Sequence, residues 1–301
     1  MQSFATKASG AAAISVGLLT ALPSTAGPVV FSVGGTAAIS SIQTTVTDFQ
    51  TALGNPNNGN GAGTTGGRRE INWDGGDPTL VANAPGGTPF NVFLNNRGAQ
   101  FTTPGTGFIQ APPSGGPQNG LAGAFTNPTY GDIFNVFSPS RDFTPVGSNV
   151  TQGQFFIPGT NGGTAAQVTG FGAVFTDVDS ATSTKIDFFD INGNLLTEQS
   201  VPAGTVPNKS LSFLGVVFNA GEEIFRITIT SGNAALATGT NDDATHDLVV
   251  MDDFLFSEPT AVAATVPEPA SLSLLGAALA GMGLFGWRLG RRNQSSARTL
   301  T

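Results

Sequence analysis

Short apolar runs separated by turns dominate the second half of the chain. Between 224 and 230, Phe225, Ile227 and Ile229 alternate with mainly polar residues, the period of two expected of a half-buried strand. Asn192-Gly193 lies between two such runs and is a strong hairpin signal. Further runs lie at 168–175, 183–189, 195–200, 211–218 and 248–256. The pattern predicts a mainly β fold, with an antiparallel, jelly-roll-like sandwich over residues 150–258.

The region before it, residues 27–149, is rich in glycine and less regular. We expect strands at 28–33 and 133–137. Ile42, Val46 and Phe49 fall at helical spacing, which predicts a short helix over about 40–53. The pattern leaves open whether this region adds strands to the sandwich or wraps around it.

The N-terminus carries a signal for export. An apolar stretch at 11–22, too short to span a membrane comfortably, precedes Ser24-Thr25-Ala26. Small residues at these positions are typical of a signal-peptidase site, so we expect residues 1–26 to be a signal peptide cut after Ala26.

The C-terminal segment predicts a membrane anchor. Residues 270–287 carry no charge and have about the length of a membrane-spanning helix. Arg288, Arg291 and Arg292 follow, and arginines clustered beside an apolar helix hold that end in the cytoplasm. We therefore expect an exported domain, a linker at 259–265, one transmembrane helix and a cytoplasmic tail at 293–301.

The order of features at 266–292 resembles the PEP-CTERM sorting signal of bacteria, a segment also named the ice-binding protein C-terminal domain. Pro267-Glu268-Pro269 forms the motif, and the apolar stretch and the basic residues follow it. The resemblance implies export, temporary anchoring in the membrane, cleavage by an exosortase-type protease, and release to the cell surface or beyond. A permanent single-span anchor is the alternative.

A second resemblance lies inside the chain. The segment Gly-Arg-Arg-Glu-Ile-Asn-Trp-Asp-Gly at 67–75 is similar to one found in uncharacterised secreted bacterial proteins, and it implies no activity. Two interpretations remain open: a structural strand in which Arg68 or Arg69 pairs with an acid, or a sugar-binding site in which Trp73 stacks on the ligand between Asn72 and Asp74. We favour the structural strand because buried tryptophans are common in cores.

Composition excludes several classes of function. The chain has 12 Lys and Arg against 20 Asp and Glu, a net charge of −8, which disfavours nucleic acid as a partner. It has no cysteine and one histidine, so disulfides and Cys/His zinc sites are excluded. That histidine, His246, lies in a polar loop without a nucleophile motif, and we expect no enzymatic activity.

Clustered aspartates predict a calcium site. The run containing Asp252 and Asp253 resembles the closing strand of carbohydrate-binding jelly rolls, in which an aspartate ligates calcium. Adjacent strand residues face opposite sides, so one of the two should point inward and need a partner. With Asp177 and Asp179 they form the expected Ca²⁺ ligands; the alternative is ordinary surface charge.

These features together predict an exported, non-enzymatic surface or matrix protein that binds extracellular polysaccharide. A secreted glycan hydrolase or lyase is the competing class. A purely structural envelope protein is the third.

Overall fold

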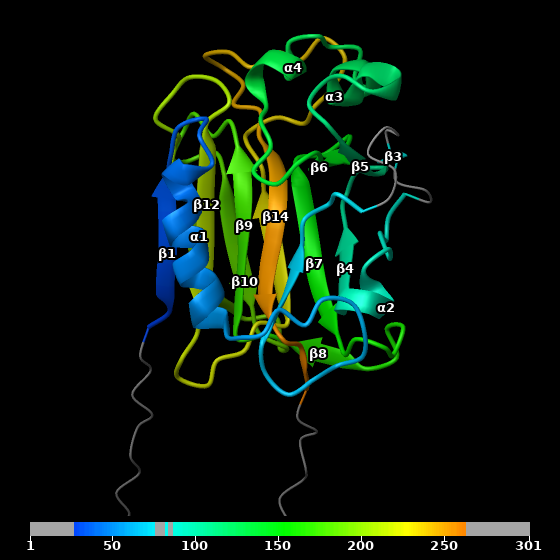
Figure 1. Ribbon diagram of the computed structural model, residues 1–301, viewed down its shortest axis with the longest axis vertical. Helices are drawn as coiled ribbons and strands as arrows, with labels where there is room; N and C mark the ends of the chain where they lie inside the picture. Colours follow the sequence, from blue (N-terminus) through cyan, green and yellow to red (C-terminus); the bar gives the residue numbers. More distant parts are fainter. Residues whose placement is uncertain (1–26, 76–81, 84–86, 263–301) are drawn as a thin grey trace, which may run out of the picture. The chain divides into compact units, whose positions relative to one another are not determined.

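The computed structural model describes residues 27–75, 82–83 and 87–262 (Figure 1). The chain divides into two compact units, 1–260 and 261–301. The signal peptide, the sorting motif and the apolar stretch predicted from the sequence lie outside the described residues. Within the first unit, two antiparallel β-sheets face each other.

Sheet A contains the strands on either side of the last long strand, β14. Its order is β1 (Val29–Gly34), β12 (Leu211–Val217), β9 (Gly170–Thr176), β14 (Val250–Ser257), β6 (Asp142–Val146), β5 (Gly107–Ala111) and β3 (Ala82–Asn83), and β2 (Arg68–Ile71) also pairs with β14.

Sheet B is built around β7. Its order is β11 (Leu195–Ser200), β10 (Lys185–Phe189), β13 (Arg226–Thr230), β7 (Val150–Phe156) and β8 (Ala165–Gln167), and β4 (Ala99–Thr102) also pairs with β7. The remaining elements are α1 (Ser40–Leu53), α2 (Leu94–Arg97), the 3₁₀ turn η1 (Pro117–Asn119), α3 (Gly120–Ala124), α4 (Tyr130–Ile133) and the short β15 (Thr260–Ala261).

The mainly β class and the two antiparallel sheets confirm the prediction from the alternating pattern. The predicted helix coincides with α1. Strands from the glycine-rich region join the same sheets as those that follow it, since β4 pairs with β7 and β6 pairs with β14.

Aromatic side chains fill the space between the sheets. Phe171 and Phe254 of sheet A pack there with Phe101 and Phe155 of sheet B. Trp73 lies among them, fully buried and stacked on the ring of Phe143 with 3.7 Å between centroids, and the rings of Phe93 and Phe254 meet it edge-on. Phenylalanine, with 23 copies, therefore supplies the apolar area that a chain poor in other aromatics needs for its core.

Helix α1 covers part of the outer face of sheet A (Figure 1). Its buried residues, Ile42, Val46, Phe49 and Leu53, follow the helical spacing seen in the sequence. Gly172 and Gly215 lie beneath Phe49, and a Cβ on Gly215 would come within 2.6 Å of the Phe49 ring. The two glycines therefore allow the helix to approach the sheet closely.

The predicted strand at 133–137 is wrong. Helix α4 ends at Ile133, and the next residues use their backbone amides elsewhere. The amide of Asn135 donates to the Thr176 hydroxyl at 3.0 Å, and that of Phe137 donates to the Asp252 carboxylate at 2.5 Å. The apolar pattern of 133–137 reflects burial beside sheet A rather than strand pairing.

A buried ion pair fixes the Gly/Asn-rich loop at 55–67. Arg69 of β2 donates twice to Glu258, with both N–O distances 2.7 Å, and neither side chain is more than 1% exposed. The remaining guanidinium bonds go to four backbone carbonyl oxygens, those of Gly59, Gly61, Ala62 and Asn96. Arg68 pairs separately with Glu70. Both arginines thus have the acidic partners that the structural interpretation of this segment expects.

Candidate functional site

Oxygen atoms from four other residues meet around the hydroxyl of Ser138. Its Oγ lies 2.7 Å from Asp253 Oδ1, 3.1 Å from Asp74 Oδ2, 3.3 Å from Asp252 Oδ1 and 3.3 Å from the Asn72 carbonyl oxygen. A hydroxyl carries one proton, so it can donate to only one of these four acceptors at a time. We call this group of five residues the Ser138 cluster.

A β-bulge in β14 brings two adjacent aspartates to the same cluster. Met251 pairs with Phe175 and Phe254 pairs with Ala173, so two residues of β14 oppose one of β9. Such a bulge bends the strand and redirects its side chains. Asp252 is fully buried and Asp253 is half-buried, yet both approach Ser138. The strict alternation expected from the sequence does not hold at this point.

Backbone amides fix the outer oxygen atoms of the cluster. Asp252 Oδ2 accepts from the amides of Phe137 and Ser138, at 2.5 and 3.2 Å. Asp74 Oδ1 accepts from the amides of Ser140 and Arg141. These bonds explain why the chain at 137–141 lies against β14 without joining the sheet.

Burial changes the protonation of the acids here. Burial first, and then the charges of Asp253 and Asp142, raise the pKa of Asp252 well above its ordinary value. Burial and the charge of Asp74 raise the pKa of Asp142 in the same direction. The pKa of Asp253 rises to about 6, chiefly through burial. Each carboxyl therefore holds a proton more tightly than an exposed aspartate does.

The sequence singled out Asn72, Trp73 and Asp74 as candidate ligand-binding residues, and the structure gives them different positions. The Trp73 ring is buried, and its indole N–H donates to the Asp252 carbonyl at 3.1 Å, so it offers no face to a sugar. Asn72, through its carbonyl, and Asp74 both contribute to the Ser138 cluster.

Asp177 and Asp179 belong to a second acidic group, at the end of β9. The charges acting on them are those of Asp242 and Asp247, not those of β14. Asp247 accepts from the amides of Asp179 and Ser180, at 3.2 and 3.0 Å. The four aspartates expected to share one calcium ion therefore lie in two separate groups.

A cavity of about 490 Å³ opens beside this second group, lined by Asp179, Asp242, Asp243, Asp247, Asn208 and Asn233 among others. Asp177 is fully buried with a left-handed φ of 68°, and neither of its carboxyl oxygens has a hydrogen-bond partner among the described residues. Burial first, then the nearby acids, raise its pKa to about 8.

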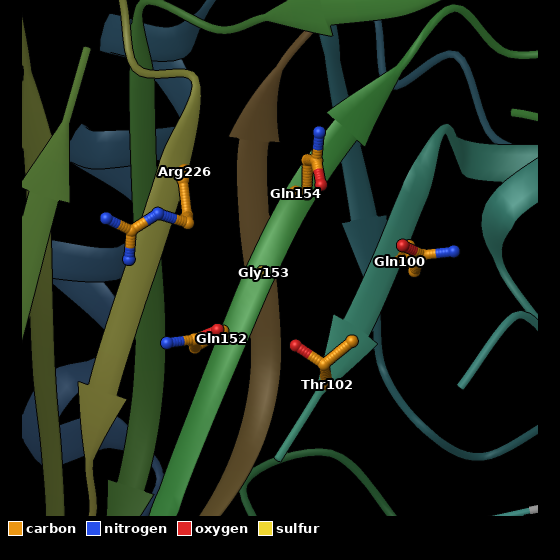
Figure 2. A pocket seen from close by; sticks show the side chains of 6 residues that line it. All are labelled: Gln100, Thr102, Gln152, Gly153, Gln154 and Arg226. Atoms are coloured by element: carbon orange, nitrogen blue, oxygen red, sulfur yellow. The ribbon is translucent and has the colours of Figure 1, made fainter. Parts of the chain in front are cut away.

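Polar side chains form two rows across the outer face of sheet B (Figure 2). Gln154 of β7 lies opposite Arg226 of β13 and Gln100 of β4. One step along the strands, Gln152 lies opposite Thr228 and Thr102. The rows follow from strand alternation, because residues of β7 and β13 are alternately buried and half-buried. We call this surface the glutamine face.

The glutamine face contains a small hollow of about 40 Å³, lined by Gln100, Thr102, Gln152, Gly153, Gln154 and Arg226, none of them acidic (Figure 2). The Arg226 guanidinium lies 3.9 Å over the ring of Phe189 and donates to the Thr228 hydroxyl at 3.0 Å. We did not predict this site; the Gln-Gly-Gln alternation at 152–154 was the available signal.

The comparisons with known proteins concern the C-terminal segment. A family model described as the PEP-CTERM protein-sorting motif matches residues 265–292. The chain carries a PEP-CTERM protein-sorting motif. The motif implies export, sorting to the cell envelope or surface, and processing by exosortase, as the sequence predicted. Neither the comparison with curated proteins nor that with solved structures found a match. Across residues 27–75, 82–83 and 87–262, no helix is long and apolar enough to span a membrane.

Proposed function

We propose that this protein is a non-enzymatic surface protein that binds extracellular polysaccharide on the glutamine face. The observation that supports this function is the register of Gln154 with Arg226 and Gln100, which aligns side-chain donors and acceptors across three strands. A side-chain amide offers both a donor and an acceptor, and neighbouring sugar hydroxyls require both.

The width of the surface agrees with a short glycan. Strands lie about 4.7–4.9 Å apart, so the three strands span about 10 Å, the scale of two sugar rings. Successive strands from β9 to β14 alternate between the sheets in part, as in the expected jelly-roll-like sandwich, and β13, β7 and β4 lie side by side in sheet B. An extended chain could therefore lie across the strands.

The competing function, a glycan hydrolase or lyase, has weaker support. The His246 side chain is 45% exposed, and its Nδ1 lies 3.4 Å from Asp243 and 3.2 Å from Thr245 in its own loop. Asp252 has the raised pKa of a general acid, but it is fully buried. Glycosidases need two carboxyl groups that flank a bound sugar. A third function, a purely structural envelope protein, predicts no glycan binding at all.

The first prediction concerns binding. The full-length protein, purified in mild detergent, is screened on a glycan array, and the glycans that bind are then tested with the double variant Gln152→Ala/Gln154→Ala. Each amide bond contributes about 0.5–1.5 kcal/mol, so we expect affinity to fall about tenfold.

The matched control is Gln43→Ala on α1, where Gln43 is exposed on the sheet A side. Its affinity should equal that of the unmodified protein. An equal loss of glycan affinity in both variants would reject the glutamine face as the site. The same holds if the unmodified protein binds no glycan on the array. New reducing ends in the incubated glycan would favour the enzyme instead.

The second prediction concerns sorting. Replacing Glu268, the carboxylate between Pro267 and Pro269, should prevent recognition by exosortase and leave the protein in the membrane fraction. The exposed Asp48→Ala on α1 is the control for loss of one carboxylate. Intact-mass analysis of both proteins in the native host shows whether Trp287 is still attached. Processing of Glu268→Ala at the normal rate would contradict the prediction.

A further inference from the structure

Strand β1 leaves one edge of sheet A open. It stands at the end of the strand order, and among the described strands it pairs with β12 alone (Figure 1). The other ends of the two sheets are short or charged: β3 and β15 have two residues each, and β11 carries Glu198, which pairs with Lys185. Natural proteins commonly protect edge strands by such shortness or charge. The six residues of β1, Val-Val-Phe-Ser-Val-Gly, have neither protection.

The hydrogen-bond pattern shows which backbone groups of β1 face the open edge. The amide of Gly35 donates to the Leu211 carbonyl at 2.8 Å, and this pair continues the register of β1 with β12. In an antiparallel ladder every second residue bonds to the neighbouring strand. Phe31 therefore bonds to β12, whereas the N–H and C=O groups of Val30 and Ser32 point away from β12, toward the edge.

The side chains along this edge carry no charge. Val29 and Val30 are each 41% exposed, and Phe31 packs on Phe49 of α1 with 5.5 Å between ring centroids. Residues 27–47 contain no charged side chain, although the chain as a whole has a net charge of −8. Two copies of so acidic a protein repel each other, so a contact between copies is least opposed where neither contributes charge.

We infer that β1 pairs with β1 of a second copy of this chain, antiparallel about a two-fold axis, so that their two A sheets become continuous. In the register that fits, Phe31 lies opposite Phe31 of the second copy, and Val30 of each copy lies opposite Ser32 of the other. Their edge-facing backbone groups then exchange hydrogen bonds in both directions. The alternative, with Ser32 opposite itself, needs the edge at Gly34, where a Cβ would come within 1.9 Å of the Ala203 carbonyl oxygen.

The strand is self-complementary in this register. Val29, Phe31 and Val33 share the face of β1 that α1 covers, so Val29 of one copy lies opposite Val33 of the other and the whole row is apolar. Aromatic and β-branched pairs across strands stabilise a sheet by about 0.2–1 kcal/mol each. The two-fold axis uses the same edge in both copies, so the assembly closes as a dimer. The glutamine face lies on sheet B and stays uncovered.

The first test measures the ratio of monomer to dimer by sedimentation of the full-length protein in mild detergent over a range of concentration. Val30→Pro removes an N–H that points to the edge while β1 keeps its bonds to β12, and Val30→Lys places a charge there. Both should weaken dimerisation about tenfold or more, with melting curves showing a folded protein. Leu195→Lys, at a position 55% exposed on β11, is the matched control and should dimerise as the unmodified protein does.

Cysteine cross-linking tests the register, because the chain has no cysteine of its own. Val30→Cys and Ser32→Cys proteins, when mixed, should form a disulfide-linked dimer, since residues opposite each other in a hydrogen-bonded pair have Cα atoms about 5.5 Å apart. Each protein alone should cross-link much more slowly. Its cysteines then lie on a diagonal, about 7–8 Å apart, which is beyond the usual span of a disulfide.

Three results would overturn the inference. In the first, the unmodified protein sediments as a monomer at every concentration. In the second, it dimerises but both Val30 variants dimerise equally well, which assigns the contact to another surface. In the third, the mixed cysteine proteins cross-link no faster than either protein alone. Glycan binding is measured separately with the glutamine variants, so either proposal can fail alone.

Discussion

Replacing Glu258 by glutamine is expected to destabilise the sandwich by about 3–5 kcal/mol, because it leaves the buried Arg69 charge without its counter-ion. Glutamine has nearly the same shape, so the loss reports charge and hydrogen bonding rather than a cavity. Denaturant unfolding of the full-length protein at neutral pH measures the difference. In a melting curve the same loss should lower Tm by about 10 °C.

Replacing the other member of the pair, Arg69→Met, should lower the free energy of unfolding by at least as much. Methionine fills the space but donates nothing, so the carbonyls of Gly59, Gly61, Ala62 and Asn96 lose their partner along with Glu258. For the same reason, the double variant Arg69→Met/Glu258→Leu should not recover stability as some buried ion pairs do when both members are replaced.

Arg68→Gln is the matched control for this prediction. Arg68 is the neighbouring residue, and it pairs with Glu70 where both side chains retain some exposure, 13% and 21%. A pair in contact with water contributes about 0–1 kcal/mol. If Glu258→Gln is no more destabilising than Arg68→Gln, the buried pair does not hold the loop at 55–67.

Local patterns in the sequence predicted the elements well because they depend on nearby residues. Alternation at 224–230 and the Asn192-Gly193 turn require only their own backbone, and the structure has β13 and a hairpin there. The spacing of Ile42, Val46 and Phe49 defined the apolar stripe of α1 for the same reason. Residues 133–137 show the limit of this reasoning, because burial without pairing produces the same apolar pattern as a strand.

The composition of the Ser138 cluster could not be predicted in this way. Asp74 and Asp253 are far apart in the chain, and they meet because β2 pairs with β14. The register of that pairing and the bulge at Asp252 depend on the packing of the whole sheet. The glutamine face has the same origin: Gln152 and Gln154 are visible in the sequence, but their neighbours on β4 and β13 follow from the strand order.

The second acidic group gives a prediction in which pH changes stability. Asp177 has a pKa of about 8 in the folded protein, against about 3.9 for an unfolded aspartate. Burial is the main cause, followed by the charges of Asp242 and Asp179; the Lys209 amide acts in the opposite direction, and the charge of Asp247 is the smallest contribution. The folded state therefore binds the proton more tightly than the unfolded state does.

Linkage sets the direction of the effect. Protonated Asp177 adds to the free energy of unfolding fully below about pH 4. This contribution is lost as pH rises toward 8, because Asp177 releases its proton at lower pH in the unfolded chain than in the folded protein. Asp242, with a pKa raised to about 6 mainly by burial, adds to the loss in the lower part of this range. In the presence of chelator, we expect the free energy of unfolding to fall between pH 5 and 8.

Asp177→Asn should abolish the part that Asp177 contributes to this fall in the free energy of unfolding. Asparagine accepts the left-handed backbone at φ 68° and carries no proton to release. The variant should therefore be more stable than the unmodified protein at pH 8, by on the order of 2–4 kcal/mol, with little gain near pH 4.5. Denaturant unfolding across this range measures the difference between the two proteins.

The control for this change is Asp243→Asn, in the loop beside the same cavity. Hydrogen bonds from Thr245 and His246 lower the pKa of the exposed Asp243 to about 2, so its contribution has the opposite sign: it is present at neutral pH and lost in acid. Asp243→Asn should give no gain at pH 8. Parallel curves for Asp177→Asn and the unmodified protein would mean that Asp177 has an ordinary pKa, and that water or an ion reaches its carboxyl group in the folded state.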